Sequence, residues 1–214
     1  MLTLPIRIRE VIRPDGTRVR TLFVFCPRED TSVQPERCAR CGFRCPPADV
    51  GLAPAVGCEV ELPEGEAPSE ASDGLVFGHH AIAARVSAGA ASTQIVVCLE
   101  ADTPLCVASG VVDPGRWTAF PVVDDKGTLL GAVPGAMLTR SSQEPRERFI
   151  SAVEAMRPVR SVRDSDHLDE VISIMTAHHL RCVPIVDVAH RVTGVLSDLE
   201  LLRWVARGAP VRWR

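Results

Sequence analysis

Apolar residues in the C-terminal part of the chain follow two different periods in a fixed order. Residues 168–175 carry apolar side chains at 168, 171, 172 and 175, the i, i+3, i+4, i+7 spacing of an amphipathic helix. Two short apolar runs follow at 182–187 and 193–196, with a turn at 189–191 between them, which predicts two strands. Residues 198–206 return to helical spacing. The pattern predicts a mixed α/β unit of strand, helix, strand, strand, helix.

The same unit occurs a second time earlier in the chain. Phe120-Pro121-Val122-Val123-Asp124 returns as Val183-Pro184-Ile185-Val186-Asp187, an offset of 184 − 121 = 63 residues. The offset holds without a gap, because Gly131 maps on Gly194 and Leu105 maps on Leu168. Two copies of one supersecondary unit create an internal two-fold relation. The crevice between their equivalent surfaces is a natural place for a small ligand.

Local signals refine these elements. Pro121 and Pro184 each remove a hydrogen-bond donor from a strand, which favours a strand start or a sheet edge. Asp166 is placed as the N-cap of the helix that follows it. Gly110 and the turn 113–115 predict a shorter helix in the first copy than in the second.

The N-terminal part has a different composition. Ile6 to Cys26 alternate around the turn 13–16, which contains Pro-Asp-Gly, and this predicts a β-hairpin. An acidic stretch rich in Pro, Gly and Ser predicts a linker. We therefore expect four segments, listed here in chain order: a Cys-rich zinc-ribbon-like module at 1–60, an acidic linker at 61–75, a first repeat at 76–140 and a second repeat at 141–214.

At this point the second repeat resembles a known family. Its segments 156–158, 168–171, 179–187 and 194–200 are similar to the CBS domain, the small regulatory unit named after cystathionine beta-synthase. The first repeat is similar more weakly, and the two together look like a tandem pair, or Bateman module. The resemblance implies a fold of two β-α-β-β-α repeats, binding of adenine nucleotides without chemistry on them, and a homodimer assembled through the helices.

The family's ligand motif is Gly, two apolar residues, Ser or Thr, two residues of any type, then Asp. The second repeat supplies Gly194, Val195 and Ser197, with Glu200 at the Asp position. The resemblance implies that the hydroxyl meets phosphate and that the carboxylate binds the ribose hydroxyls. Arg181, at the start of a predicted strand, is placed to add a bidentate contact to phosphate. Ser197 is also placed to cap the following helix, and Glu200 to be a surface charge, so a purely structural interpretation stays open.

The first repeat departs from this motif at both polar positions. Pro134 stands at the position of Ser197 and Met137 at the position of Glu200. Proline donates no hydrogen bond and methionine cannot bind a diol. We therefore expect at most one nucleotide site in each chain.

Five cysteines gather in the N-terminal quarter. Cys26, Cys38, Cys41 and Cys58 have the form of a zinc ribbon, because a Cys-x-x-Cys turn and two strand cysteines can supply four thiolates to one Zn²⁺. Cys45 could take the place of Cys58. An iron–sulfur cluster and a thiol redox pair at Cys38 and Cys41 are the alternatives.

Composition sets the remaining limits. The net charge of −3 and the single lysine, Lys126, do not indicate nucleic-acid binding. No apolar run reaches the roughly 20 residues of a membrane span, so we expect a cytoplasmic protein. No catalytic motif is recognisable, which favours a non-enzymatic sensor with an unknown downstream protein partner. The alternative is a dimerisation scaffold whose ribbon binds protein or nucleic acid.

Overall fold

The computed structural model describes residues 2–29, 31–42, 44–45, 55–58, 86–92, 95–113, 118–144 and 149–206. The predicted linker at 61–75 lies outside these residues. The elements in chain order are β1 Leu2–Ile12, β2 Arg18–Cys26, β3 Thr31–Val33, α1 Pro35–Ala39, β4 Arg44–Cys45, β5 Ala55–Cys58, α3 Ala88–Ala91, β6 Ile95–Glu100, α4 Leu105–Val111, β7 Ala119–Val123, β8 Leu129–Pro134, α5 Gly135–Gln143, α6 Ala152–Ala155, β9 Val162–Arg163, α7 Leu168–Ala177, β10 Cys182–Val186, β11 Val192–Ser197 and α8 Asp198–Ala206.

The described strands form two sheets. The larger one has the order β3-β2-β1-β6-β7-β8, with β5 paired to β1 and β4 paired to β5. The smaller one has the order β11-β10-β9. The strand set β6-β7-β8 of the first repeat and the set β9-β10-β11 of the second share one pattern, a parallel pair followed by an antiparallel pair. The mixed α/β fold of the two repeats is confirmed.

Each repeat is entered by a short helix that packs on the other repeat. The start of α3 joins the second repeat, since the amides of Ala88 and Gly89 donate to the carbonyls of Asp166 and Asp164. The start of α6 joins the first repeat in the same way, through Ala152 N–H to the Thr103 carbonyl at 2.8 Å. The buried clusters show the same exchange of helices between the repeats. Ala88 of α3 lies in the core of the second repeat, and Ala152 of α6 lies in the core of the first. The two repeats are therefore interlocked.

The internal two-fold relation is visible where the repeats meet. Leu129 N–H donates to the His190 carbonyl, and Val192 N–H donates to the Gly127 carbonyl, both at 3.0 Å. The 63-residue offset relates the two bonds: the donor Leu129 corresponds to the donor Val192 (129 + 63 = 192), and the acceptor Gly127 corresponds to the acceptor His190 (127 + 63 = 190). A third buried cluster, which includes Val96 and Val195, fills the space between the two sheets. The duplicated halves thus face each other across a packed core.

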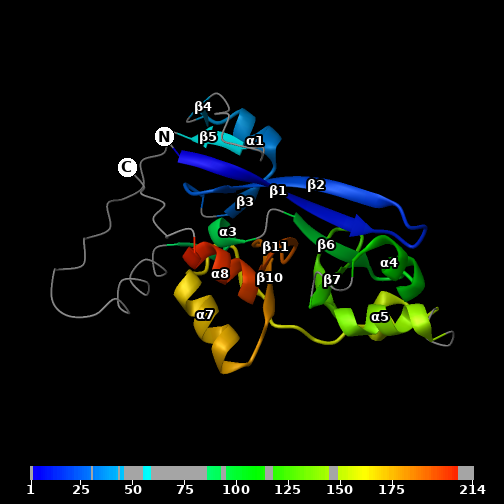
Figure 1. Cartoon of the computed structure of the whole chain (residues 1–214). Coiled ribbons are helices and arrows are strands. Elements are labelled where there is room, and N and C mark those ends of the chain that lie inside the picture. Colours follow the sequence, from blue (N-terminus) through cyan, green and yellow to red (C-terminus); the bar gives the residue numbers. More distant parts are fainter. Residues whose placement is uncertain are drawn as a thin grey trace.

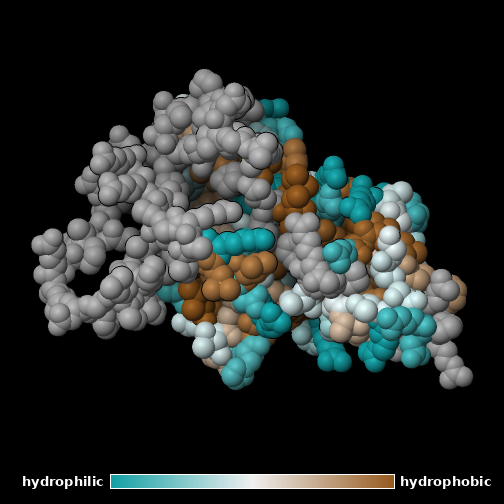
Figure 2. Space-filling view, in the orientation of Figure 1, coloured by the Kyte–Doolittle hydropathy of each residue, from teal (hydrophilic) through white to brown (hydrophobic). Residues whose placement is uncertain are grey.

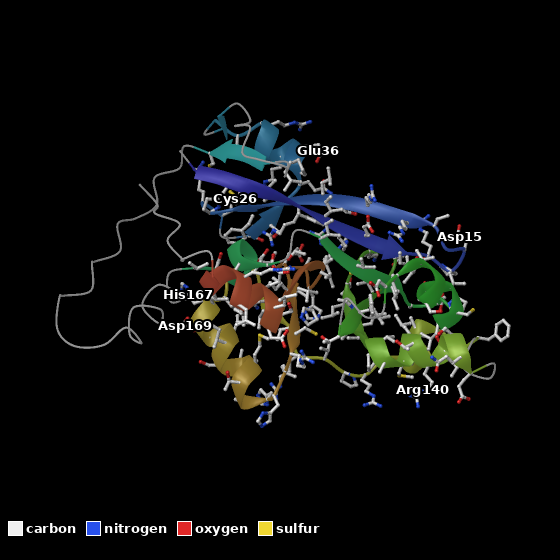
Figure 3. The ribbon with its side chains drawn as sticks, viewed as in Figure 1. Asp15, Cys26, Glu36, Arg140, His167 and Asp169 are labelled. Carbon is white, nitrogen blue, oxygen red and sulfur yellow. The ribbon has the colours of Figure 1, made fainter. Side chains whose placement is uncertain are left out.

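The N-terminal hairpin belongs to the same body as the repeats. β1 and β2 pair antiparallel from Ile6↔Val24 to Ile12↔Arg18, which confirms the predicted hairpin. β1 also pairs in parallel with β6, from Ile8↔Ile95 to Ile12↔Leu99. Figure 1 shows the hairpin lying across both repeats, and Figure 3 places Asp15 at its tip and Cys26 at the opposite end of β2. The hairpin continues the sheet of the first repeat.

Two local predictions were wrong. Pro184 lies in β10, which is the central strand of its sheet, and Pro121 lies in the equivalent central strand β7. Pairing to β9 begins only at Ile185, so the absent N–H of Pro184 falls before the parallel ladder. The N-cap of α7 is His167 and not Asp166. The Asp166 carboxylate instead accepts the Arg163 N–H at 2.8 Å and closes the preceding turn.

Candidate functional site

The motif residues of the second repeat lie at the junction between β11 and α8. Ser197 ends the strand, and its Oγ accepts the N–H of Glu200 at 3.2 Å, so it caps the helix. This bond occupies a lone pair of the hydroxyl and leaves its proton free for another acceptor. Val195 is buried in the core between the sheets, so its side chain serves packing. The groups at this junction that could contact a ligand are therefore the Ser197 hydroxyl and the backbone N–H groups at the amino-terminal end of α8.

Two ion pairs surround this junction. Arg181, one residue before β10, donates from Nε to the Asp198 carboxylate at 3.0 Å. The side chain of Arg181 remains 73% exposed, so this pair lies at the surface. Glu200 accepts from Arg203 at 2.8 Å along the same helix. Surface pairs of this kind contribute little to stability. Arg181 and Glu200 can therefore leave their partners and bind a ligand with little loss of folding free energy.

The corresponding junction in the first repeat has no polar side chain at these positions. Pro134 is the N-cap residue of α5, and no side-chain hydrogen bond caps that helix. Met137 packs against the core of the first repeat. The two junctions share their backbone plan and differ in chemistry.

The motif glycines differ in what covers them. A Cβ built on Gly131 would stand 2.8 Å from the carbonyl oxygen of Arg157 and 2.9 Å from Met156 Sδ. A Cβ on Gly194 would stand 2.8 Å from Ser92 Oγ and 3.8 Å from Arg7 Nη1. The first glycine is thus covered by a backbone and a thioether. The second is covered by a hydroxyl and a guanidinium.

Arg7 reaches this position from the N-terminal hairpin. Only 1% of its surface is exposed. Nη1 donates to Ser92 Oγ at 2.9 Å and Nη2 to Ser32 Oγ at 3.3 Å, while Nε has no hydrogen-bond partner among the residues that the structure describes. The Phe25 ring lies 5.7 Å from the guanidinium carbon. Burial lowers the pKa of Arg7 to about 10, against the opposing effect of Asp164, and the group still carries a full positive charge at neutral pH.

Arg9, two residues further along β1, is held differently. Its Nη1 donates to the backbone carbonyls of Val192 at 3.1 Å and Gly127 at 3.5 Å. These carbonyls belong to the turn regions where the two repeats meet. Burial lowers the pKa of Arg9 as well. Arg9 therefore joins the two repeats through fixed backbone acceptors, whereas Arg7 is held by two rotatable hydroxyls.

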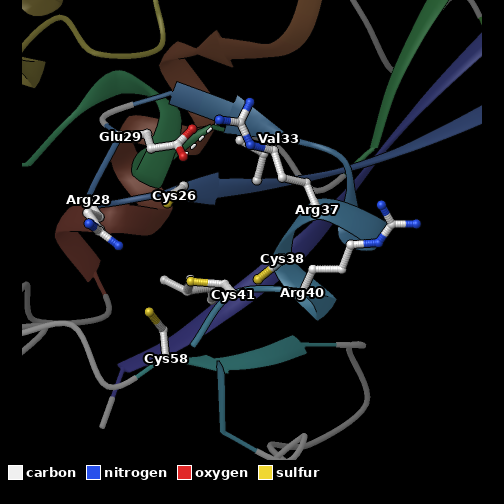
Figure 4. A pocket seen from close by; sticks show the side chains of 10 residues that line it. Cys26, Arg28, Glu29, Val33, Arg37, Cys38, Arg40, Cys41 and Cys58 are labelled. Atoms are coloured by element: carbon white, nitrogen blue, oxygen red, sulfur yellow. Dashed lines mark hydrogen bonds and ion pairs between the residues drawn. The ribbon is translucent and has the colours of Figure 1, made fainter. Parts of the chain in front are cut away.

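The four predicted zinc ligands gather around one cavity. Cys26, Cys38, Cys41 and Cys58 all line a space of about 270 Å³, and they arrive from the end of β2, from α1 and the turn after it, and from the end of β5 (Figure 4). Arg28, Arg37 and Arg40 also line this cavity. Among the described residues, however, no three His, Cys, Asp or Glu side chains stand close enough together to hold a metal ion. In the described part of the chain, the four thiols thus reach one cavity but do not lie close enough together to form a metal site.

Cys45, the other predicted ligand, lies in the two-residue strand β4, where its backbone pairs with Gly57. Cys98 is fully buried between the sheets, and burial raises its pKa to about 12. Cys106 and Cys182 are only partly buried. Of these three cysteines, which lie in the two repeats, Cys98 is therefore the one that the core encloses completely.

Reasoning from the sequence missed the two buried arginines. The alternation Ile6-Arg7-Ile8-Arg9 predicts a strand but does not show that its polar face is buried. The structure buries that face under the second repeat. A signal was present in the partner strand, where Phe23 and Phe25 carry aromatic rings at the positions that stack on Arg9 and Arg7.

Comparison with known proteins identifies the second repeat. Residues 150–207 match the family model of the CBS domain. The match begins at the entry to α6 and ends at the end of α8, so this part of the chain is similar to a CBS domain over the whole second repeat.

Solved CBS-domain structures resemble the repeat region. The CBS domain of a bacterial CNNM/CorC family Mg²⁺ transporter in complex with ATP aligns with a TM-score of 0.53 and 12% identity, over 61% of this chain and 94% of that one. CBSX2 in complex with AMP aligns with a TM-score of 0.48 and 24% identity, over 57% of this chain and 97% of that one. The first of these likenesses supports the fold of a CBS pair.

A curated relative matches part of the sequence. The uncharacterized protein YlbB of Bacillus subtilis (strain 168) is 35% identical over 89 residues, which is 39% of this chain and 59% of the relative. The chain thus matches a little over half the length of that relative. No described helix has the length and apolar character that crossing a membrane requires.

Proposed function

We propose that the chain is a regulatory module that binds an adenine nucleotide at the second repeat and does no chemistry on it. The observation that carries the proposal is the junction of β11 and α8, where Ser197 and Glu200 occupy the motif positions of a CBS domain and Arg181 lies beside the helix start. A phosphate at this helix terminus would gain from backbone N–H groups and the helix dipole.

The roles of the residues follow from their donors and acceptors. The Ser197 hydroxyl caps α8 through its lone pair and would donate its proton to a phosphate oxygen. The Glu200 carboxylate would exchange Arg203 for the two ribose hydroxyls. Arg181 would exchange Asp198 for phosphate. The CBS domain solved with ATP supports a ligand of this class.

The test is titration calorimetry of the full chain with AMP, ADP, ATP and S-adenosylmethionine. We expect one ligand for each chain. Replacing a hydrogen bond to a charged group costs about 1.5–3 kcal/mol, so Ser197→Ala and Glu200→Ala should each weaken binding by about ten-fold or more. Pro134→Ala and Met137→Ala are the matched controls at the equivalent first-repeat positions and should leave binding unchanged. The absence of heat with all four compounds would reject the proposal.

A second candidate function is metal binding in the N-terminal module. The observation that favours it is the convergence of Cys26, Cys38, Cys41 and Cys58 on one cavity. Four cysteines are the donor set of a structural Zn²⁺ site, and the metal would draw the sulfurs together at about 2.3 Å from the ion. The three arginines that line the cavity would offset the negative charge of four thiolates.

Elemental analysis of purified protein tests this candidate. We expect about one zinc for each chain, and its loss in a Cys38→Ser, Cys41→Ser variant. Cys106→Ser, a partly buried cysteine outside the cavity, is the control and should retain the metal. Bound iron with visible colour would indicate a cluster instead, and a metal-free protein with a reversible thiol reaction would indicate a redox pair.

We also propose that two chains assemble through the helices of the repeats. Figure 2 shows apolar side chains over α8, where Leu199 and Leu202 are 49% and 65% exposed. Light scattering of the full chain should give the mass of a dimer, and Leu202→Glu should shift it to a monomer. A dimer that binds no nucleotide would favour the alternative of a scaffold whose N-terminal module binds a macromolecule.

We also propose that this regulator is a cytoplasmic protein and that it acts on a downstream protein partner.

A further inference from the structure

We infer that Asp164 of the second repeat holds β3 of the N-terminal module in place, and that it thereby couples the second repeat to the cavity that four cysteines line. This thiol cavity is the space lined by Cys26, Cys38, Cys41 and Cys58. The inference goes beyond the proposed function, because the contacts that carry it involve neither the Ser197 junction nor a metal ion.

The joint between the two parts is a short hydrogen bond between buried groups. Ser32, the central residue of β3, donates its N–H to the Asp164 carboxylate at 2.6 Å. Ser32 is 8% exposed and Asp164 is 1% exposed, so little water reaches either group. A buried donor that loses its acceptor is left with the cost of its lost hydration. Separation of β3 from the second repeat at this point is therefore unfavourable.

The backbone of Asp164 is fixed within the second repeat. Its N–H donates to the Val186 carbonyl of β10 at 3.0 Å, and its carbonyl accepts the Gly89 N–H of α3 at 2.8 Å. The side chain is then the part of the residue that contacts the N-terminal module. A displacement of β10 or α3 would therefore displace the acceptor of the Ser32 N–H.

β3 forms part of the wall of the thiol cavity. Val33, its last residue, lines the cavity, and α1, which carries Cys38, begins two residues later. Along its other edge β3 pairs with β2, and this pairing ends at Cys26. Figure 4 shows Val33, Cys26 and Cys38 around the same space. The strand that Asp164 holds is thus directly connected to the lining of the cavity.

Arg7 of β1 adds a second connection. Its Nη2 donates to Ser32 Oγ at 3.3 Å, and its Nη1 donates at 2.9 Å to the Oγ of Ser92, just after α3. Its charge attracts the Asp164 carboxylate through space. A buried polar network of this kind tolerates little displacement, because a shift leaves more of its polar atoms without partners. β3, Asp164 and α3 are therefore held in one arrangement.

The first repeat shows that the fold of a repeat does not require this carboxylate. Ala101 stands at the equivalent position, since 101 + 63 = 164. Its N–H makes the same backbone bond, to the Val123 carbonyl at 3.0 Å, but alanine has no side-chain acceptor. The module is attached to the first repeat by the backbone ladder of β1 and β6, whereas Arg9 and Asp164 attach it to the second repeat through their side chains. A movement of the second repeat relative to the first would therefore act on β3 through Asp164.

Hydrogen–deuterium exchange of the full chain, measured by mass spectrometry over residues 31–39, tests this joint. Asp164→Ala gives the second repeat the residue that the first repeat has. We expect it to raise the exchange rate over 31–39 by about ten-fold or more, as the loss of one hydrogen bond to a charged group does to a local opening equilibrium. Asp166→Ala is the matched control, because it removes a carboxylate that closes its own turn. It should change this rate by less than about two-fold.

A nucleotide tests the coupling, and this part of the experiment rests on the proposed function. The probe is AMP, ADP, ATP or S-adenosylmethionine, whichever binds most tightly in calorimetry. A ligand that binds the folded second repeat stabilises it, so saturation should slow exchange over 31–39 by about two-fold or more in the wild type. It should leave Asp164→Ala unchanged. Asp164→Asn keeps an oxygen for the Ser32 N–H without the charge, and it replaces Asp164→Ala in both measurements if the latter does not fold.

The outcomes separate this inference from the proposed function. Equal exchange over 31–39 in Asp164→Ala and Asp166→Ala would overturn the role of Asp164. A wild-type chain that binds a nucleotide without any change over 31–39 would overturn the coupling. A chain that binds none of the four compounds would reject the proposed function, while the comparison of the two alanine variants would still decide whether Asp164 holds β3.

Discussion

The two repeats have nearly the same scaffold and different surfaces at the same positions. β10, β11 and α8 in the second repeat match β7, β8 and α5 in the first at a constant offset of 63 residues. At the strand–helix junction, however, Ser197 and Glu200 face Pro134 and Met137 of the first copy. The covering groups differ too, since Ser92 and Arg7 lie over one motif glycine and Met156 over the other.

This comparison separates the residues that the fold requires from the residues that only a ligand site would require. The buried leucines at 105 and 168 and the hydrogen bonds between the turns are kept in both copies, because both copies build one core. The polar groups at the junction are kept in one copy only, because the packing of the core does not depend on them.

The largest effect is expected in the two cores. Leu105 and Leu168 are both fully buried, and Leu→Ala in a core costs about 2–5 kcal/mol. Since the core of each repeat contains the short helix that enters the other repeat, Leu105→Ala and Leu168→Ala should lower the midpoint of one shared unfolding transition by similar amounts. Scanning calorimetry checks this, with Val188→Ala, 80% exposed, as the control. Two resolved transitions, each moved by one variant, would show that the repeats unfold separately.

The motif glycines should respond unequally to Ala. A methyl group at Gly131 meets a backbone oxygen that cannot move alone. At Gly194 it meets the Ser92 side chain, whose Oγ can rotate away and whose Cβ, at 3.0 Å, has to shift only slightly. We expect Gly131→Ala to lower the free energy of unfolding by about 1–3 kcal/mol, as overpacking does, and Gly194→Ala by less than about 1 kcal/mol. Urea denaturation measures both. Equal losses would contradict this account.

The turns between the paired strands differ at one backbone position. Gly127 has φ +83°, and His190, its equivalent, has φ +60°, a conformation that costs a non-glycine residue roughly 1–2 kcal/mol. His190→Gly should raise the free energy of unfolding by roughly 0.5–1 kcal/mol after the entropy of glycine is subtracted. The reverse comparison, Gly127→Ala, should destabilise the chain because the new methyl group would collide with the Arg9 guanidinium. A loss of stability in His190→Gly would refute the explanation.

The smallest effect concerns the helices that enter the repeats. α6 begins with a capping box, in which the Glu154 carboxylate accepts from the Ser151 hydroxyl and N–H. These bonds lower the pKa of Glu154 below its usual 4.5. Because the folded pKa is the lower one, the ionised carboxylate stabilises the fold above pH 4.5, and this contribution is lost as pH falls through the folded value.

Glu154→Gln should therefore be less stable than the wild type at neutral pH and should approach it in acid. In α3 the residue three after Ser87 is Ala90, which has no carboxylate to titrate. Thermal melts of both proteins between about pH 3 and pH 7 measure the difference. A difference in thermal stability between the two proteins that stays constant with pH would show that Glu154 acts through its shape and not through its charge.

Elements with strong periodicity were predicted well. α8 spans 198–206 as expected, and α7 begins at Leu168 as its apolar spacing indicates. α4 is shorter than α7, as Gly110 and the following turn predicted. Periodicity reports which residues are buried, and burial is enough to fix such elements.

The pairing of distant segments could not be predicted in this way. Alternation in β1 indicates a strand but does not say that β6 is its parallel neighbour, since any apolar strand edge meets the same requirement. The exchange of α3 and α6 between the repeats also depends on the tertiary arrangement. For the same reason the burial of Arg7 and Arg9 could not be predicted. Their burial follows from what lies opposite them and not from their own sequence.

The pairing of β1 with β6 has a practical consequence for truncation. If residues before Ile95 were removed to isolate the CBS pair, β6 would become an edge strand with a free row of backbone donors and acceptors from Ile95 to Leu99. Open edges of this kind recruit other chains. Ile12 would also leave a gap in the core of the first repeat. A shortened protein would therefore tend to aggregate, and its failure to bind a nucleotide would say little about the intact chain.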